Sequence, residues 1–167
     1  MRDLGAGDVK WRDGKTAIYV FNAGEDVAQV KKAAYAMFSE ENGLGPAAFP
    51  SLARMEREVT AFGLQLLNAP PGAAGGMTSG GTDSIFMAVK AARDYARSKC
   101  KSGPFNMVTP YSAHPAFHKA GMVMDIEVRR TPLKDYLADP AVIEAAADDN
   151  TIMIVGSAPC FPFGLID

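Results

Sequence analysis

The run S-G-G-T-D-S at positions 79–84 has the composition of an anion-binding turn and precedes a stretch with the apolar spacing of a long helix. Gly80 and Gly81 allow a sharp turn and let a ligand approach the main-chain amides closely. The first turn of a helix offers unpaired N–H groups and the positive end of the helix dipole. Thr82 and Ser84 add hydroxyl donors. The pattern predicts either a phosphate-binding turn or a tight strand-to-helix turn with a threonine cap.

Other chemistry-bearing side chains are few. His114 precedes Pro115 in a loop after a predicted strand, where histidines are most often solvated or cap a helix. His118 is one helical turn further on and is expected to face solvent or cap the helix. Cys160 lies in a proline-flanked loop with no identifiable base, so we expect an inert thiol. Together with Cys100 it has no metal-ligand spacing, and we predict no metal site.

The spacing of apolar residues along the chain predicts the helices and strands that carry these side chains. Helices are predicted from Glu25, from Pro50 with Ser51 as N-cap, over 82–99 and over 140–147. Strands are predicted over 16–21, 76–79, 106–109, 123–128 and 151–156. Strands alternating with helices predict an α/β fold with a mostly parallel sheet covered on both faces.

Two further features are predicted, one buried and one exposed. Apolar spacing in the second helix predicts a buried stripe formed by Leu52, Met55, Val59, Phe62, Leu66 and Leu67. The acidic pair Asp148-Asp149 precedes a strand and is expected to be a solvated turn.

Composition narrows the classes of partner. Hydrophobic residues make up 48% of the 167, which suffices for a folded core, and the net charge is −2. A near-neutral chain lacks the basic footprint of a nucleic-acid-binding protein. No apolar run has the length of a membrane span, and no signal peptide is recognisable. We therefore expect a cytoplasmic protein whose partner is a small molecule or another subunit.

Five segments, in order, resemble the pyridoxal-phosphate (PLP)-dependent sphingosine-phosphate lyase and group II amino-acid decarboxylase family. Residues 77–85 resemble its T-S-G-G-T-E-S-I stretch. The other four segments resemble its S-G-x-x-Y, N-P-L-H-P-D-x-F-P, x-S-A-H-x-A-F-x-K-A and S-T-P-x-F-P-H-G-x-I-D elements and span 14–19, 42–50, 111–120 and 157–167. The resemblance implies the large domain of PLP enzymes of fold type I, preceded by a helical segment.

The same resemblance implies roles for individual residues. Gly80, Gly81 and Thr82 would hold the cofactor phosphate. His114 would lie on the face of the pyridine ring and act in catalysis. In the family such enzymes are homodimers, in which some groups serve the neighbouring subunit's site.

Tyr19 and Asn42 would line the substrate pocket, where the family contacts a phosphate or carboxylate of an amine substrate. Two positions depart from the family pattern. Gly45 stands where N-P-L-H-P has its histidine, and Phe163 where F-P-H-G has its histidine. These departures leave PLP binding intact but weaken the case for a sphingosine-phosphate substrate.

Residues 1–50 are expected to form an arm, a helix and a substrate-pocket loop, and residues 51–167 the first part of the cofactor-binding domain. The family continues to an Asp and a Lys that complete the PLP site, so we expect the chain to be part of a longer protein and inactive alone. Three functions fit. The first is a PLP aldehyde-lyase acting on a phosphorylated amino alcohol, the second a PLP amino-acid decarboxylase, and the third a non-catalytic phosphate-binding fragment.

Overall fold

The computed structural model describes residues 5–14, 16, 20–99 and 101–167. The chain divides into two compact units, Met1–Gly76 and Met77–Asp167, and each is a separate body. The predicted strand over 16–21 lies partly outside the described residues. Positions 16, 20 and 21, which are described, do not belong to a strand.

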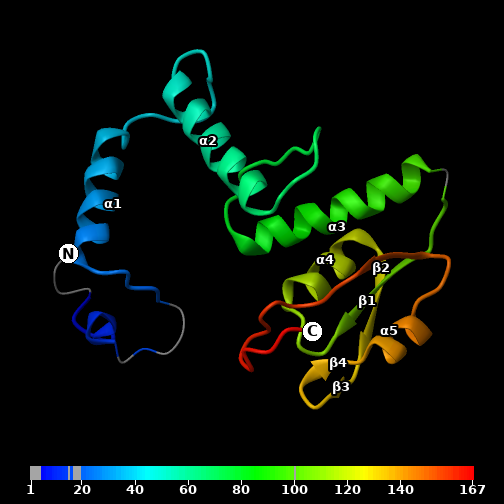
Figure 1. Ribbon diagram of the computed structural model, residues 1–167. Helices are drawn as coiled ribbons and strands as arrows, with labels where there is room; N and C mark the ends of the chain where they lie inside the picture. Colours follow the sequence, from blue (N-terminus) through cyan, green and yellow to red (C-terminus); the bar gives the residue numbers. More distant parts are fainter. Residues whose placement is uncertain (1–4, 15, 17–19, 100) are drawn as a thin grey trace. The chain divides into compact units, whose positions relative to one another are not determined.

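The first unit is helical (Figure 1). It contains the short 3-10 helix η2 (Trp11–Asp13) and the helices α1 (Glu25–Met37) and α2 (Pro50–Leu66). Both long helices begin at the predicted residues. Phe49 rather than Ser51 is the N-cap of α2, because Pro50 occupies the first helical position, where its missing N–H costs nothing.

The predicted buried stripe of α2 is wrong. The helix has no buried residue, and Val59, Phe62 and Leu66 are 55%, 68% and 72% exposed. The apolar spacing shows which face of a helix is hydrophobic but not what covers that face. Within the described part of the first unit, α1 and α2 do not pack closely on each other, so neither covers the other's apolar residues.

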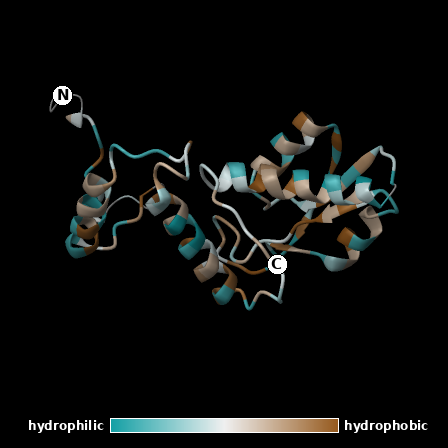
Figure 2. Cartoon of the chain, turned by 90° about the horizontal axis from the view of Figure 1, so that it is seen from above, coloured by the Kyte–Doolittle hydropathy of each residue, from teal (hydrophilic) through white to brown (hydrophobic). Residues whose placement is uncertain are grey.

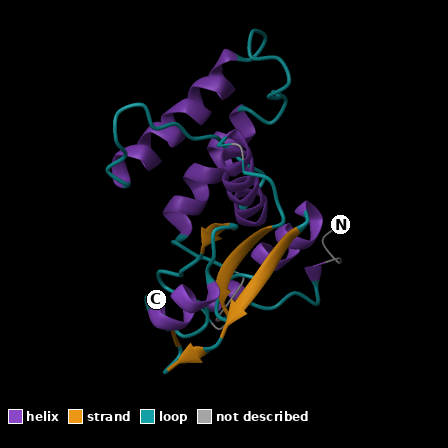
Figure 3. Cartoon of the chain, turned by 90° about the vertical axis from the view of Figure 1, so that its right-hand side faces the viewer, coloured by secondary structure: helices purple, strands orange, loops and turns teal. Residues whose placement is uncertain are grey.

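The second unit is an α/β layer structure. In chain order it contains α3 (Gly81–Ser98), β1 (Phe105–Pro110), α4 (Ala116–Met124), β2 (Ile126–Thr131), β3 (Leu133–Lys134), β4 (Leu137–Ala138), α5 (Pro140–Ala146) and β5 (Thr151–Ile154). The sheet has the order β2-β1-β5, and both neighbours run parallel to β1. The two long arrows in Figure 3 point the same way. Strands β3 and β4 form a separate antiparallel hairpin.

Helices cover both faces of this sheet. The connection through α4 carries the chain from β1 to β2, and the connection through α5 returns it across β1 to β5. Because such parallel crossovers are right-handed, the two opposite steps place α4 and α5 on opposite faces. Helix α3 packs against α4 and β5, so it shares the face of α4 (Figure 1). The predicted parallel α/β arrangement is confirmed.

Two strand predictions need correction. The strand predicted over 123–128 begins at Ile126, because Asp125 adopts a left-handed conformation (φ 55°) that ends α4 after Met124. Residues 76–79 are not a strand. A strand requires a hydrogen-bonding neighbour, and the three-stranded sheet of the described residues pairs only β2, β1 and β5.

The core surrounds β1. All six of its residues are buried, as expected for a central parallel strand covered on both faces. Met107 from β1 packs with Val89 of α3 and Ala120 of α4 in the main hydrophobic cluster. Gly121 brings α4 close to β2, because a Cβ at this position would overlap the Val128 side chain. Figure 2 shows hydrophobic residues concentrated along these strands.

Asp148 joins the connection before β5 to the amino end of the sheet, so it is more than the solvated turn that its sequence suggested. Its carboxylate accepts hydrogen bonds from Asn106 Nδ2 (2.7 Å), Arg129 Nη1 (2.7 Å) and Asn150 N (2.9 Å). These bonds, the one from Asn106 foremost and then that from Arg129, lower the pKa of Asp148 to about 2.

Stability should therefore depend on pH through Asp148. Because its folded-state pKa lies below the unfolded value of about 4, its contribution is complete above that pH. The contribution is lost as the pH falls toward about 2. Asp148→Asn is expected to destabilise the fold at neutral pH and to flatten the acid dependence of the melting temperature, measured by circular dichroism. Asp149→Asn is the control and should keep the wild-type dependence. Identical acid profiles for wild type and Asp148→Asn would contradict this role.

Candidate functional site

The turn before α3 is open and built on glycine. Gly80 has φ 155° and ψ 177°, a conformation that L side chains rarely adopt. The first helical hydrogen bond runs from Ser84 N to Gly80 O (3.0 Å), so the helix itself does not use the amides of Gly81, Thr82 and Asp83. A Cβ at Gly80 or Gly81 would meet no atom within 4 Å. The turn thus presents amide donors and a helix dipole to open space, which suits a phosphate group.

Side chains around the turn fix its shape. The Asp83 carboxylate accepts from Ser79 N (3.0 Å) and from Ser79 Oγ (3.1 Å). Thr78 Oγ1 lies 2.6 Å from Ser84 Oγ, so the Ser84 hydroxyl is engaged within the turn rather than presented to a ligand as predicted. The organising role of Asp83 was not predicted from the sequence. An acidic residue in the third position of a helix, reaching back to the preceding turn, is the signal that could have revealed it.

His114 lies in the loop between β1 and α4 and is exposed. Its Nδ1 accepts a hydrogen bond from the amide of Ala116, the first residue of α4 (3.1 Å). A second bond, from Phe117 N to His114 O (3.1 Å), holds its backbone. Since Nδ1 is an acceptor here, the ring proton of the neutral imidazole belongs on Nε2. The ring therefore has a fixed orientation and a defined tautomer.

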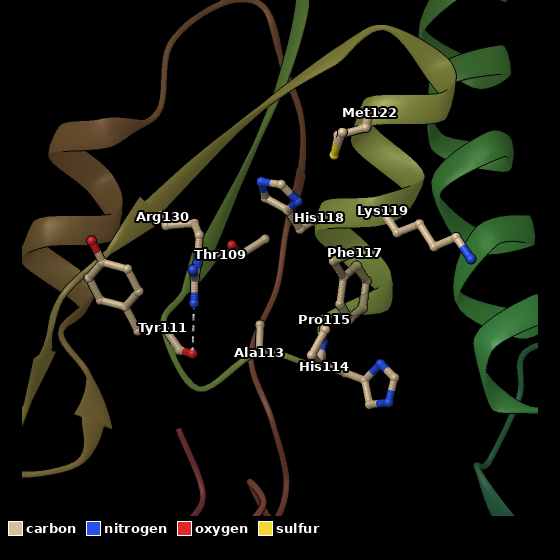
Figure 4. A pocket seen from close by; sticks show the side chains of 10 residues that line it. All are labelled: Thr109, Tyr111, Ala113, His114, Pro115, Phe117, His118, Lys119, Met122 and Arg130. Carbon is tan, nitrogen blue, oxygen red and sulfur yellow. Dashed lines mark hydrogen bonds between the residues drawn. The ribbon is translucent and has the colours of Figure 1, made fainter.

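A cavity of about 340 Å³ lies beside this loop. His114 and Tyr111 line it from the loop, His118 from α4 and Arg130 from the end of β2. Figure 4 shows the His114 ring pointing away from Arg130, toward the side on which the chain enters α3. His118 is exposed, as predicted.

The glycine turn and His114 lie at the same edge of the sheet. A short connection joins the end of α3 at Ser98 to the start of β1 at Phe105, so α3 must end at the amino edge. Its 18 residues then run back about 27 Å, which exceeds the roughly 20 Å of a six-residue strand. The start of α3 therefore reaches the carboxyl edge, where the loop with His114 begins. Ligand sites of open α/β sheets lie at this edge.

The predicted substrate-pocket residues belong to the first unit. Tyr19 lies outside the described residues. Asn42 is exposed, and its Oδ1 accepts from Leu44 N (3.1 Å), which shapes the loop around it. Because the two units are separate bodies, Asn42 has no defined position relative to His114.

Two further residues bear on the chemistry. Phe163, at a departure from the family pattern, packs against Tyr136 with ring centroids 4.7 Å apart. Cys160 is only 2% exposed, so its thiol is inaccessible to a substrate.

Throughout the described ranges, no three His, Cys, Asp or Glu side chains come together as metal ligands. No helix among the described residues is both long and apolar enough to cross a bilayer.

Comparison with known proteins relates this chain to one group. No family model matches it. It is 44% identical to sphingosine-1-phosphate lyase of Oryza sativa subsp. japonica over 177 residues, covering 100% of this chain and 32% of the relative. It is 37% identical to sphingosine-1-phosphate lyase 1 of Rattus norvegicus over 168 residues, covering 100% of this chain and 29% of the relative. The chain is a homologue of the sphingosine-1-phosphate lyases. It spans about a third of the length of these lyases.

Solved structures give the same relationship. Sphingosine-1-phosphate lyase of Burkholderia pseudomallei superimposes with a TM-score of 0.90 at 33% identity, over 99% of this chain and 40% of the lyase chain. Glutamate decarboxylase of Lactobacillus brevis has a TM-score of 0.70 at 21% identity, over 91% of this chain and 36% of its own, which shows a shared fold. The predicted fold class is confirmed.

The orientation of His114 is testable by NMR. In protein with 15N-labelled histidine, the neutral His114 ring is expected to be almost entirely the Nε2–H tautomer, because the Ala116 amide occupies Nδ1. Long-range 1H–15N correlation distinguishes the two ring nitrogens, and His114→Gln identifies the signals. Ala116→Pro deletes the amide that donates to Nδ1 and should therefore increase the Nδ1–H form. A dominant Nδ1–H tautomer in the wild type would refute the arrangement.

Proposed function

We propose that the protein carrying this chain is a PLP-dependent carbon–carbon lyase that cleaves a phosphorylated amino alcohol to an aldehyde and phosphoethanolamine. The 44% identity to the rice lyase across the whole chain is the observation that carries the proposal. The chain spans about a third of that lyase, so activity, substrate and partners all belong to the proposal.

The residues at the start of α3 fit the cofactor's phosphate. Gly80, Gly81 and Thr82 would hold it through main-chain amides and the Thr82 hydroxyl, with the helix dipole favouring its negative charge. The Asp83 carboxylate is already satisfied by Ser79, which limits its repulsion of an anion in the turn. The solved Oryza sativa TDC contains PLP and tryptamine, and its fold matches this chain with a TM-score of 0.65.

Bound PLP supplies an electron sink that stabilises negative charge on a substrate carbon. This chain's contribution would be to orient the cofactor and substrate. His114 would place its flat ring on the pyridine face, held in that orientation by the Ala116 amide. Asn42 and Tyr19 would bind an anionic group of the substrate, and the bond between Asn42 Oδ1 and Leu44 N leaves the side-chain amide N–H groups of Asn42 to donate.

We further propose a cytoplasmic homodimer with shared active sites, in which residues 1–50 supply the arm, helix and substrate-pocket loop and residues 51–167 begin the cofactor-binding domain. The family resemblance supports the homodimer with shared active sites. Light scattering tests the dimer, and activity regained on mixing two inactive site variants would test the shared sites.

A PLP-dependent amino-acid decarboxylase is the second candidate. A probable L-tyrosine/L-aspartate decarboxylase of Methanothrix thermoacetophila is 38% identical over 135 residues, covering 80% of this chain and 34% of the relative. Gly45 and Phe163 replace histidines of the lyase pattern, which favours a substrate with different polar groups.

Product analysis on the native protein with added PLP separates the two candidates. An aldehyde from a phosphorylated long-chain amino alcohol supports the lyase. Carbon dioxide from an amino acid supports the decarboxylase. Neither product, together with no protein-dependent change in the PLP absorbance spectrum, would refute both and leave a non-catalytic phosphate-binding protein.

Gly81→Val tests the phosphate turn. The branched side chain would project into the space that the cofactor phosphate needs, so PLP affinity is expected to fall at least about tenfold, a cost of ~1.4 kcal/mol. Titration of PLP absorbance measures this affinity. Gly63→Val is the matched control, because a Cβ at Gly63 also meets open space but lies in α2. Equal PLP affinity in the wild type, Gly81→Val and Gly63→Val would exclude the turn as the phosphate site.

His114 variants separate stacking from proton transfer. His114→Ala is expected to lower kcat strongly while much of the PLP stays bound, and His114→Phe, which keeps a flat ring, should retain more activity. If instead both variants lose ~10²–10⁴-fold, the size typical of acid–base catalysis, His114 transfers a proton. Steady-state kinetics with PLP occupancy measured on the same samples gives the answer. Unchanged kcat in both variants would exclude a catalytic role.

A further inference from the structure

Arg130 contacts Tyr111 in two ways, and neither contact is needed for the proposed roles of the glycine turn or of His114. It is the penultimate residue of the edge strand β2, and its guanidinium carbon lies 4.4 Å from the centroid of the Tyr111 ring. Its Nη2 also donates to Tyr111 O (3.2 Å), as the dashed line in Figure 4 shows. The preceding arginine, Arg129, instead pairs with Glu127 and Asp148, whereas in the described part of the chain Arg130 forms no ion pair.

Tyr111 is the first residue after β1 and is held at both backbone groups. Its N–H donates to Thr131 O (3.0 Å), which extends the ladder between β1 and β2 by one bond. Its carbonyl accepts from Arg130, and its ring lies under the guanidinium. Both contacts come from the end of β2, so the direction in which the loop leaves the sheet is set there.

The loop from Tyr111 to His114 is short and fixed at its other end as well. Ala113 N donates to Pro110 O (3.0 Å), and His114 is bonded to the first turn of α4. Displacing Tyr111 would therefore move the backbone that carries the His114 ring. Arginine suits this position because a planar guanidinium can stack flat on an aromatic ring and donate a hydrogen bond in its own plane, whereas an ammonium has no flat face to stack.

We propose that Arg130 is a positioning residue that acts through Tyr111 to fix the orientation of the His114 ring. The kinetic part of this inference rests on the proposed function, since it assumes that His114 contacts the cofactor. The structural part does not, because the orientation of His114 is measurable without PLP.

The experiment compares Arg130→Lys, Arg130→Met and Tyr111→Phe in the native protein. Arg97→Met is the control, an exposed arginine on α3 that is remote from the site. The first readout is the tautomer ratio and side-chain chemical shifts of 13C,15N-labelled His114 without PLP. Both Arg130 variants should shift or broaden these signals, since lysine keeps the charge but loses the planar contact. Tyr111→Phe keeps the ring and the carbonyl and should resemble wild type, as should Arg97→Met.

Kinetics is the second readout. A misplaced reacting geometry of about 1 Å can cost ~10²-fold, so Arg130→Lys should lower kcat by roughly 10- to 100-fold. KM and PLP affinity should stay within about twofold, because Arg130 would contact neither ligand. A wild-type kcat in Tyr111→Phe together with a reduced kcat in Arg130→Lys supports positioning. A raised KM with unchanged kcat would overturn it and make Arg130 a contact for an anionic substrate.

Failure of the proposed function and failure of the role of Arg130 would give different results. Wild-type protein that binds no PLP and turns over no substrate refutes the proposed function, while the PLP-free signals of His114 still judge the role of Arg130. Unchanged His114 signals in both Arg130 variants overturn the inference, whatever the protein's activity. If Arg130→Met does not fold, the conservative Arg130→Lys variant decides the question.

Discussion

The hydrogen-bonded ladders that hold β1 between two parallel neighbours are the constraint on which the candidate site depends. Six residues pair with β2 in continuous register from Phe105–Ile126 to Pro110–Thr131, and β5 pairs with the other edge of β1. Every residue of β1 is buried, so the strand cannot shift without exposing its core contacts. Its carboxyl end is a fixed point, and the loop that carries His114 starts from it.

The start of a long helix lies at the same edge of the sheet as this loop. Helix α3 returns along the sheet and brings the amides of Gly81 and Thr82 to the edge where β1 ends, so the positive end of a long helix dipole faces the same side as the His114 loop. A second helix start, that of α4, gives one amide to His114 Nδ1. One helix terminus is thus available to an anion while the other orients an imidazole.

At two positions where the family pattern has a histidine, this chain carries Gly45 and Phe163. Phe163 and Tyr136 form an aromatic pair beside Tyr111, and together these three side chains line a second cavity of about 520 Å³. The Phe163 ring cannot donate a hydrogen bond to a phosphate or carboxylate, as the histidine of the family pattern could. The same cavity is also lined by Leu133 and Asp135, and its two tyrosines carry hydroxyl groups, so Phe163 removes one polar group from a lining of mixed polarity.

The sequence by itself determined the features that neighbouring residues control. The glycine turn, the start of α2 at Pro50 and the loop position of His114 all follow from local dihedral preferences, missing donors and apolar spacing. Only the tertiary structure decided the roles of Asp148 and Arg130, because their partners lie 19 or more residues away, as with Asn106 and Tyr111. It also decided that the apolar face of α2 stays exposed. A periodic pattern specifies a face, whereas contacts between distant residues depend on strand register and on what packs against that face.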